Sequence, residues 1–330
     1  MMSRRRFLIS LGGAGALGAS GAWWAMRGRG LHEARRTSWA LGSEVRVTVL
    51  ADDPGAADEA AAAAIAEIET VDRALSIYRP ASEVRRLNLD GRLDAPHPCL
   101  VEVLDRARRM SEMSDGAFDA TVQPLWDVHA EAKRRGGLPP EAAVDAARER
   151  VDWRKVEATP ARVRLGPGMA ITLNGIAQGF AADRAAAVLR ARGIRHALVD
   201  AGELTALGAK DAGGPWTAGI QHPREPGSYI ALARLDGRSL ATSGDYATAF
   251  TADFSRNHLF DPRTGVSPPH FSSVTVAAPS CADADGLSTA VFVAGLDRGL
   301  AILESFPGAD ALLVLKDGRT VTTRGFPEVA

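Results

Sequence analysis

Cysteine is nearly absent from this chain, since only Cys99 and Cys281 occur among 330 residues. A disulfide-stapled miniprotein is therefore excluded. We interpret the two thiols as small buried hydrophobic residues, with one disulfide as the alternative in an oxidising compartment. A strong charge of one sign is also missing, because 39 basic residues stand against 40 acidic ones. This balance gives no general attraction for nucleic acid, so we expect no such partner, and any anionic ligand must be held by local chemistry.

Several familiar catalytic motifs are missing as well. No Gly-x-x-x-x-Gly-Lys-Ser/Thr segment occurs, and no Gly-x-Gly-x-x-Gly follows an expected strand, which excludes P-loop and Rossmann nucleotide sites. Neither His-Glu-x-x-His nor Cys-x-x-Cys is present, so nothing supports a zinc site. No Gly-x-Ser-x-Gly elbow marks a hydrolase serine. The chemistry must lie in other segments.

The N-terminal residues have the pattern of a targeting signal. Arg4, Arg5 and Arg6 precede an uncharged stretch from Phe7 to Met26 that is rich in glycine and alanine. This pattern is typical of a twin-arginine export signal, although a stretch of that length can also span a bilayer. We therefore interpret residues 1–30 as a twin-arginine signal peptide or an N-terminal anchor. The prediction places the protein in the periplasm, delivered by the export machinery.

Residues 31–330 contain no repeat and no Pro/Ser-rich linker, so we expect one domain. Apolar residues at helical spacing after Asp53-Pro54 predict a helix over 54–75, and alternation predicts a strand over 39–50. Strands come mainly in hairpins, which favours an α+β fold with mixed or antiparallel sheets and packed helices. We expect further helices over 100–110, 139–150, 179–192, 284–294 and 297–304, and strands over 163–165, 170–173, 196–200, 204–207, 217–220, 229–235, 273–277, 311–315 and 320–323.

Four polar segments stand out from this background, over residues 75–88, 115–121, 172–183 and 258–290. In the third, an expected strand runs through glycines into a helix, where backbone N–H groups can face an anion. In the fourth, Asp285 and Thr289 lie one helical turn apart on the same face. A carboxylate and a hydroxyl are hard oxygen ligands that suit Mg²⁺ better than zinc.

Each of these features also has a purely structural interpretation. Asp285 is placed to interact with the dipole of its helix, and Asn174-Gly175 fits an ordinary turn. Phe118 and Tyr78 fit core positions, and His258 before an Asp-Pro turn fits a structural hydrogen bond. The residues taken one at a time leave both interpretations open.

Taken together, in this order and spacing, the segments resemble the ApbE family of FAD:protein FMN transferases. The resemblance covers about residues 39–311. It implies an α+β fold, FAD as substrate and Mg²⁺ as cofactor. It also implies transfer of FMN to a Ser or Thr hydroxyl of an acceptor flavoprotein, a membrane or periplasmic redox protein, with release of AMP. The motifs are Tyr78-x-x-x-Ser-Glu-Val84, Gly116-Ala-Phe-Asp119, Gly175-Ile-Ala-x-Gly179, Ser243-Gly-Asp-Tyr246, His258 to Gly265, and Asp285-x-x-x-Thr289.

The resemblance also implies a role for individual residues. It places metal ligands at the backbone carbonyl of Gly175 and the side chains of Asp285 and Thr289. For such a transfer, we expect the proton of the attacking hydroxyl to pass to His258 or Asp245, with His258 as the preferred acceptor. The residues implied to contact FAD are Leu41, Tyr78, Ala117, Phe118, Asp119, Thr172, Gln178 and His258.

The chain departs from the family pattern at two positions. Thr172 stands where the family commonly has an aspartate, and Gln178 stands where it has a lysine. Both can form hydrogen bonds but bring no charge. Two other functions therefore stay open besides FMN transfer: hydrolysis of FAD to FMN and AMP with water as nucleophile, and a non-catalytic periplasmic flavin-binding assembly factor.

Overall fold

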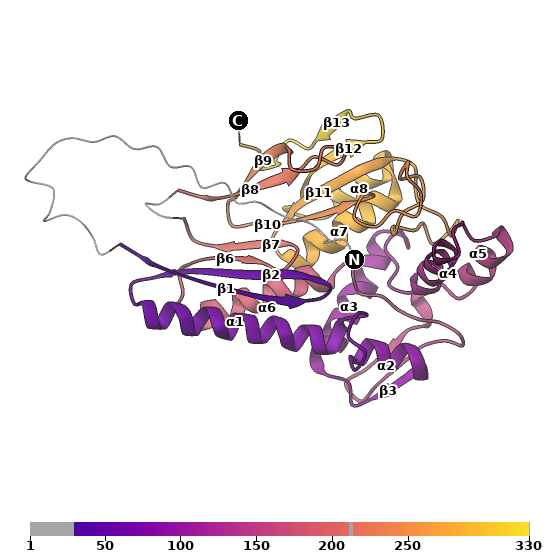
Figure 1. The fold of residues 1–330 in the computed structure, drawn as a ribbon, viewed down its shortest axis with the longest axis horizontal. Helices are drawn as coiled ribbons and strands as arrows, with labels where there is room; N and C mark the ends of the chain where they lie inside the picture. The colour runs from indigo at the N-terminus through magenta and orange to yellow at the C-terminus, as the bar shows by residue number, and fades with distance from the viewer. Residues whose placement is uncertain (1–29, 211–213, 330) are drawn as a thin grey trace, which may run out of the picture.

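The computed structural model describes residues 30–210 and 214–329. Its centre is an eight-stranded sheet in which all neighbouring strands are antiparallel (Figure 1). The prediction of antiparallel sheets with packed helices is thus confirmed. In spatial order the strands are β1 (His32–Ala40), β2 (Ser43–Ala51), β6 (His196–Asp200), β7 (Leu204–Leu207), β10 (Ser239–Gly244), β11 (Phe271–Ala278), β12 (Asp310–Leu315) and β13 (Thr320–Thr322).

A layer of helices covers one face of this sheet. The long helix α1 packs against β1, β2 and α6, and α6 in turn packs against α7, which lies on β10 and β11. The buried face of α1 is largely alanine, which lets neighbouring helices approach closely. Asp53 accepts a hydrogen bond from the Ala56 N–H and so begins the helix. These helices are α1 (Pro54–Leu75), α3 (Pro98–Met113), α6 (Ala177–Ala191), α7 (Cys281–Ala294) and α8 (Leu296–Ser305).

Side chains alternate between the two faces of the sheet along each strand, and apolar residues lie on both faces. Val45, Val47 and Val49 of β2 enter the large core under the helices, whereas Leu50 enters a second core on the opposite face. That second core is closed by the hairpin of β8 (Trp216–Gln221) and β9 (Tyr229–Leu235). The central strands are therefore buried on both sides, which fixes their register.

Smaller elements gather at one end of the sheet. Helices α2 (Glu83–Asp90), α4 (Gln123–Arg134) and α5 (Glu141–Arg148) lie there (Figure 1). A 3₁₀ turn follows α5 in the chain at Trp153–Lys155. A three-stranded sheet is formed by β3 (Arg92–Asp94), β5 (Arg162–Arg164) and β4 (Glu157–Ala158).

The structure corrects several predicted elements. The strand predicted over 39–50 is broken, because Leu41 and Gly42 have φ of +52° and +79° and form the turn between β1 and β2. Residues 170–173, predicted as a strand, form none, and β5 pairs with β3 and β4. Helices α2 and α4 and strand β10 were not predicted.

The expectations for residues 1–30 fall outside the described residues except at Gly30. Over residues 30–210 and 214–329, no helix is both long enough and apolar enough to cross a membrane. Cys99 and Cys281 are both buried and both free thiols. Burial raises the pKa of each thiol, so both fit the prediction of small hydrophobic core residues.

Candidate active site

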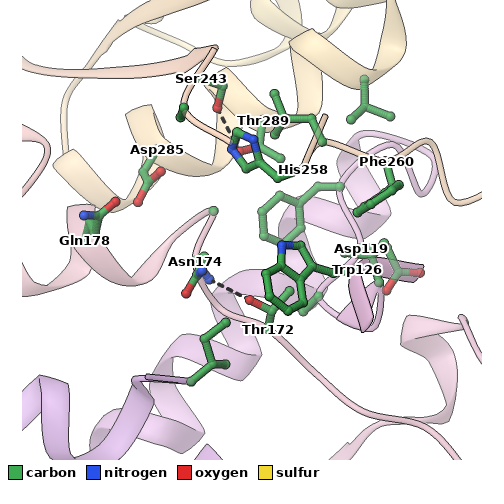
Figure 2. A pocket seen from close by; sticks show the side chains of 18 of the residues that line it. Asp119, Trp126, Thr172, Asn174, Gln178, Ser243, His258, Phe260, Asp285 and Thr289 are labelled. Atoms are coloured by element: carbon green, nitrogen blue, oxygen red, sulfur yellow. Dashed lines mark hydrogen bonds between the residues drawn. The ribbon is translucent and has the colours of Figure 1, made fainter. Parts of the chain in front are cut away.

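A cleft opens where distant parts of the chain meet beside the sheet. Its walls come from the β1–β2 turn, the segment that leads into α6, the C-terminal end of β10 and one face of α7. Residues 117–126 and 258–260 close it on the other side. Figure 2 shows Asp285, Thr289 and His258 on one side of this cleft, across from Thr172 and Asn174.

Helices α6 and α7 hold each other in place at the cleft through a reciprocal pair of carboxylates. Asp285 of α7 accepts a hydrogen bond from the Gly179 N–H at 3.0 Å. Asp183 of α6 accepts hydrogen bonds from the first two N–H groups of α7, those of Cys281 and Ala282, at 2.9 Å each. Burial raises the pKa of Asp183, and these two backbone donors counteract the shift. The contact is so close that a Cβ on Gly179 would lie 2.2 Å from the Cys281 carbonyl oxygen.

One turn further along α7, Thr289 lies beside the glycine of the segment that leads into α6. A Cβ on Gly175 would lie 2.9 Å from Thr289 Oγ1, so only glycine lets the backbone come this near. Ser243 Oγ forms hydrogen bonds with Thr289 Oγ1 at 3.1 Å and with Ser288 Oγ at 2.8 Å. The Thr289 hydroxyl is thereby held against the Gly175 backbone.

This arrangement suits a magnesium ion that takes some of its oxygen ligands from the protein and the others from a bound substrate and water. Within the described part of the chain, no group of three or more His, Cys, Asp and Glu side chains could hold a metal ion. A single carboxylate, a hydroxyl and a backbone carbonyl nevertheless match Mg²⁺, which commonly takes one or two carboxylates and completes its shell with water and substrate phosphates. The donors at Asp285, Thr289 and Gly175 fit such an ion.

One end of the cleft is lined by polar groups. Gln178 Nε2 donates to Ser43 Oγ at 3.0 Å, and Gly202 has φ of +96° with no room for a Cβ beside the Gln178 amide. The buried carboxylate of Glu203 accepts a hydrogen bond from the Thr242 N–H at 2.9 Å. Hydrogen-bonding groups at this end suit sugar hydroxyls or a ribityl chain.

The other end is aromatic. Trp126 and Phe260 line it together with His258 (Figure 2), and Phe118 is a further lining residue. His258 Nδ1 lies 3.3 Å from the Thr248 carbonyl oxygen, which can only accept, so we assign the proton to Nδ1 and the lone pair to Nε2. Flat rings at this end suit a planar heteroaromatic ligand.

Asp119 shapes the loop at the aromatic end. Its Oδ1 accepts hydrogen bonds from the Thr121 N–H and hydroxyl at 2.7 and 2.6 Å, and its Oδ2 accepts one from the Trp153 N–H at 3.2 Å. Burial raises the pKa of Asp119, and these hydrogen bonds counteract the shift. The carboxylate thus fixes the backbone that presents Phe118.

All but two of the predicted site residues line this one cleft. Tyr78 lies next to it: its ring covers Gly42, 41% of it is exposed, and its hydroxyl accepts a hydrogen bond from Asn174 Nδ2 at 2.8 Å. Asp245 does not line the cleft and is completely buried in ion pairs with Arg224 and Lys316. The lining residues are Leu41, Ala117, Phe118, Asp119, Thr172, Gly175, Gln178, His258, Asp285 and Thr289.

Several cleft residues were missed by the sequence argument. Ser43, Trp126, Glu203 and Ser243 line the cleft without belonging to its predicted set. Gly202-Glu203 follows a predicted strand, and that position was a usable signal. Ser243 lies within the Ser243-Gly-Asp-Tyr246 motif, which by itself predicted no role for this serine. Nothing in the local sequence marks Trp126 or Ser43.

Comparison with known proteins adds an independent finding. The ApbE family model matches residues 41–313. The FAD:protein FMN transferase of Treponema pallidum is 33% identical over 328 residues, covering 89% of this chain and 88% of the relative. That of Haemophilus influenzae is 32% identical over 272 residues, covering 77% of this chain and 78% of the relative.

Solved structures agree with this similarity. The crystal structure of the ApbE protein from Thermotoga maritima aligns with a TM-score of 0.78 at 29% identity, covering 89% of this chain and 97% of that chain. The apo form of the flavinyl transferase ApbE from Pseudomonas stutzeri aligns with a TM-score of 0.77 at 31% identity, covering 89% and 96%.

Proposed function

Because this chain belongs to the ApbE family of transferases, we propose that it moves FMN from FAD to a serine or threonine hydroxyl of an acceptor protein, with Mg²⁺ as cofactor and AMP as the second product. The observation that carries the proposal is the convergence of Asp285, Thr289 and Gly175 in a cleft with one polar and one aromatic end. Such a cleft offers a place for a diphosphate between sites for sugar hydroxyls and for a flat ring.

The metal would be held by the Asp285 carboxylate, the Thr289 hydroxyl and the Gly175 carbonyl. When bound, it supplies positive charge that offsets the charge of the diphosphate and of the leaving AMP. The chain's own part is to fix these donors. Gly179 N–H orients the carboxylate and Ser243 orients the hydroxyl, so neither needs to reorganise when substrate enters.

His258 is the proton acceptor that the geometry favours. Its Nδ1–H is directed at the Thr248 carbonyl, which places the lone pair on Nε2. The acceptor's hydroxyl oxygen bonds to the FMN-side phosphorus and passes its proton to Nε2. The bond between that phosphorus and the bridging oxygen breaks, and AMP leaves with the electron pair.

Thr172 and Gln178 take part as neutral hydrogen-bonding groups. Thr172 Oγ1 accepts a hydrogen bond from the Asn174 N–H at 3.3 Å, and Gln178 is held by Ser43. Both side chains line the cleft, so they remain able to contact FAD without adding charge.

The location of the protein belongs to the same proposal. We expect residues 1–30 to direct export by the twin-arginine route, and residues 31–330 to act as the transferase domain in the periplasm, with or without retention of the N-terminus as an anchor. The acceptor would be a membrane or periplasmic redox protein that carries the Ser/Thr flavinylation motif. Lysine in place of Arg4 and Arg5 should block export, as measured by fractionation of cells.

The deciding experiment incubates the protein with FAD, MgCl₂ and a candidate acceptor, and follows acceptor mass and AMP. FMN transfer adds the mass of FMN minus water to the acceptor and releases one AMP per acceptor. Equal release of FMN and AMP without acceptor would instead establish FAD hydrolysis. FAD binding with no AMP under any condition would establish a carrier or assembly factor. EDTA, followed by Mg²⁺ in excess, is the metal control.

A further inference from the structure

Asp245 is the completely buried carboxylate that follows β10. It does not line the cleft, but it begins the excursion of the chain over residues 245–258, which returns with His258 at the cleft wall. Two cations from other parts of the fold meet it. Arg224 of the β8–β9 connection donates to both carboxylate oxygens at 2.8 and 2.7 Å, and Lys316 after β12 donates to Oδ2 at 2.5 Å.

The same two cations also hold the far part of the excursion. Lys316 Nζ donates to the Phe254 carbonyl at 3.0 Å, and the Arg224 guanidinium lies over the Phe254 ring at 4.4 Å from its centroid. Phe254 has φ of +60°, a conformation that is costly for a bulky residue and persists only where its surroundings hold it. Arg224 and Lys316 therefore tie Asp245, the first residue of the excursion, to Phe254, nine positions later.

Backbone hydrogen bonds within the excursion connect its two halves up to His258. Phe250 N–H donates to the Arg256 carbonyl at 2.7 Å, and the Thr248 carbonyl accepts from the His258 N–H at 3.0 Å. The same Thr248 carbonyl faces His258 Nδ1 at 3.3 Å. The orientation of the imidazole thus depends on the position of Thr248, which lies three residues after Asp245.

We infer that Asp245, with Arg224 and Lys316, is a positioning group that sets the orientation and tautomer of His258, and that it is not itself a proton acceptor in the reaction. The inference rests on the proposed function for the role of His258, although the orientation of the ring can be tested without it. Asp245 does not line the cleft, and both of its carboxylate oxygens already accept hydrogen bonds from Arg224 and Lys316, so the carboxylate does not face a reacting hydroxyl.

The two roles predict different results for Arg224→Ala and Lys316→Met. Neither substitution removes the Asp245 carboxylate, so a base role for Asp245 predicts that kcat holds. The positioning role predicts that kcat falls at least tenfold while KM for FAD stays within twofold, because neither Arg224 nor Lys316 lines the cleft.

A matched control lies at the opposite end of the same strands. Arg238 precedes β10 and pairs with Asp310, the first residue of β12, at 2.9 Å. Arg238→Ala removes a partly buried ion pair of the same strands without touching the excursion. It should lower thermal stability and leave kcat unchanged.

A second readout needs no turnover. The ¹⁵N signals of the His258 ring, assigned by comparison with His258→Gln, should show an Nδ1–H tautomer in the wild type and in Arg238→Ala. In Arg224→Ala and Lys316→Met they should shift toward a mixture of tautomers. Unchanged ring signals in both variants, or an unchanged or raised kcat, would overturn the inference. If the wild type transfers no FMN, the proposed function fails while the ring signals still decide the positioning role.

Discussion

Replacing Asp285 by asparagine tests the metal site with little disturbance of the fold. The side chain is 4% exposed and accepts a hydrogen bond from the Gly179 N–H. Asparagine keeps the shape and an acceptor oxygen, so the change from a charged to a neutral acceptor should cost about 1 kcal/mol of stability. What disappears is the only charge among the three donors assigned to Mg²⁺.

The expected loss of activity is much larger than the loss of stability. Removing an outer-shell partner of a metal site commonly costs about 10- to 100-fold, and a directly bound carboxylate should cost more. We expect FMN transfer to slow about 10³-fold at fixed Mg²⁺, equivalent to about 4 kcal/mol. Higher Mg²⁺ should recover part of this loss, because the neutral site binds the ion more weakly.

The assay measures the rate of FMN addition to the acceptor by mass spectrometry across a Mg²⁺ titration. Asp183→Asn is the matched control, since it neutralises the other carboxylate that joins α6 to α7 by accepting backbone hydrogen bonds. Asp183 does not line the cleft, so this variant should keep most of the wild-type rate. Wild-type transfer by Asp285→Asn, or equal losses in both variants, would refute the assignment.

Three further changes test other parts of the molecule. His258→Gln should lower kcat by about 10²- to 10⁴-fold and leave FAD affinity unchanged; weaker binding by fluorescence titration would instead make His258 a binding residue. Gly179→Ala should destabilise the fold by about 1–3 kcal/mol, because its Cβ would lie 2.2 Å from the Cys281 carbonyl oxygen, whereas Gly137→Ala, with open space around it, should not change the unfolding temperature. Burial raises the pKa of Asp200 to about 6, so the folded protein holds this proton more tightly than the unfolded chain, and stability from this group falls as pH rises from about 4 to about 7. In urea unfolding, Asp200→Asn should therefore add about 2–3 kcal/mol near pH 7.5 and almost nothing near pH 4; a gain of equal size at both pH values would contradict this.

Local sequence patterns predicted those helices and strands in which the spacing of apolar residues matches the buried face. The helix over 54–75 was predicted to its ends, because Asp53 caps it and its apolar stripe has a single period. Helix α4 was missed, since Gln123 begins it without a side-chain cap. Strand β10 was missed because all six of its residues are buried and five of them are small or polar, so no alternation appears. Burial on both faces removes the signal that would reveal such a strand.

The residues of the candidate site could likewise be predicted from the sequence only in part. Asp285 and Thr289 could be paired from the sequence, since helical geometry puts residues four apart on one face. Ser43 and Trp126 could not be placed at the site, because their position at the cleft depends on how β2 and α4 pack against the rest of the fold. Asp245 was expected at the reaction centre, but packing surrounds it with Arg224 and Lys316 instead.

By itself, the sequence determined the family and the main helices and suggested the residues proposed to bind the metal, because these depend on short spacings and on the order of motifs along the chain. Only the tertiary structure decided which of those residues face a common cavity, how closely Gly175 approaches Thr289, and which partners neutralise a buried charge. Contacts between positions far apart in the chain are set by packing and by the desolvation of whole surfaces, and no local pattern of residues encodes them.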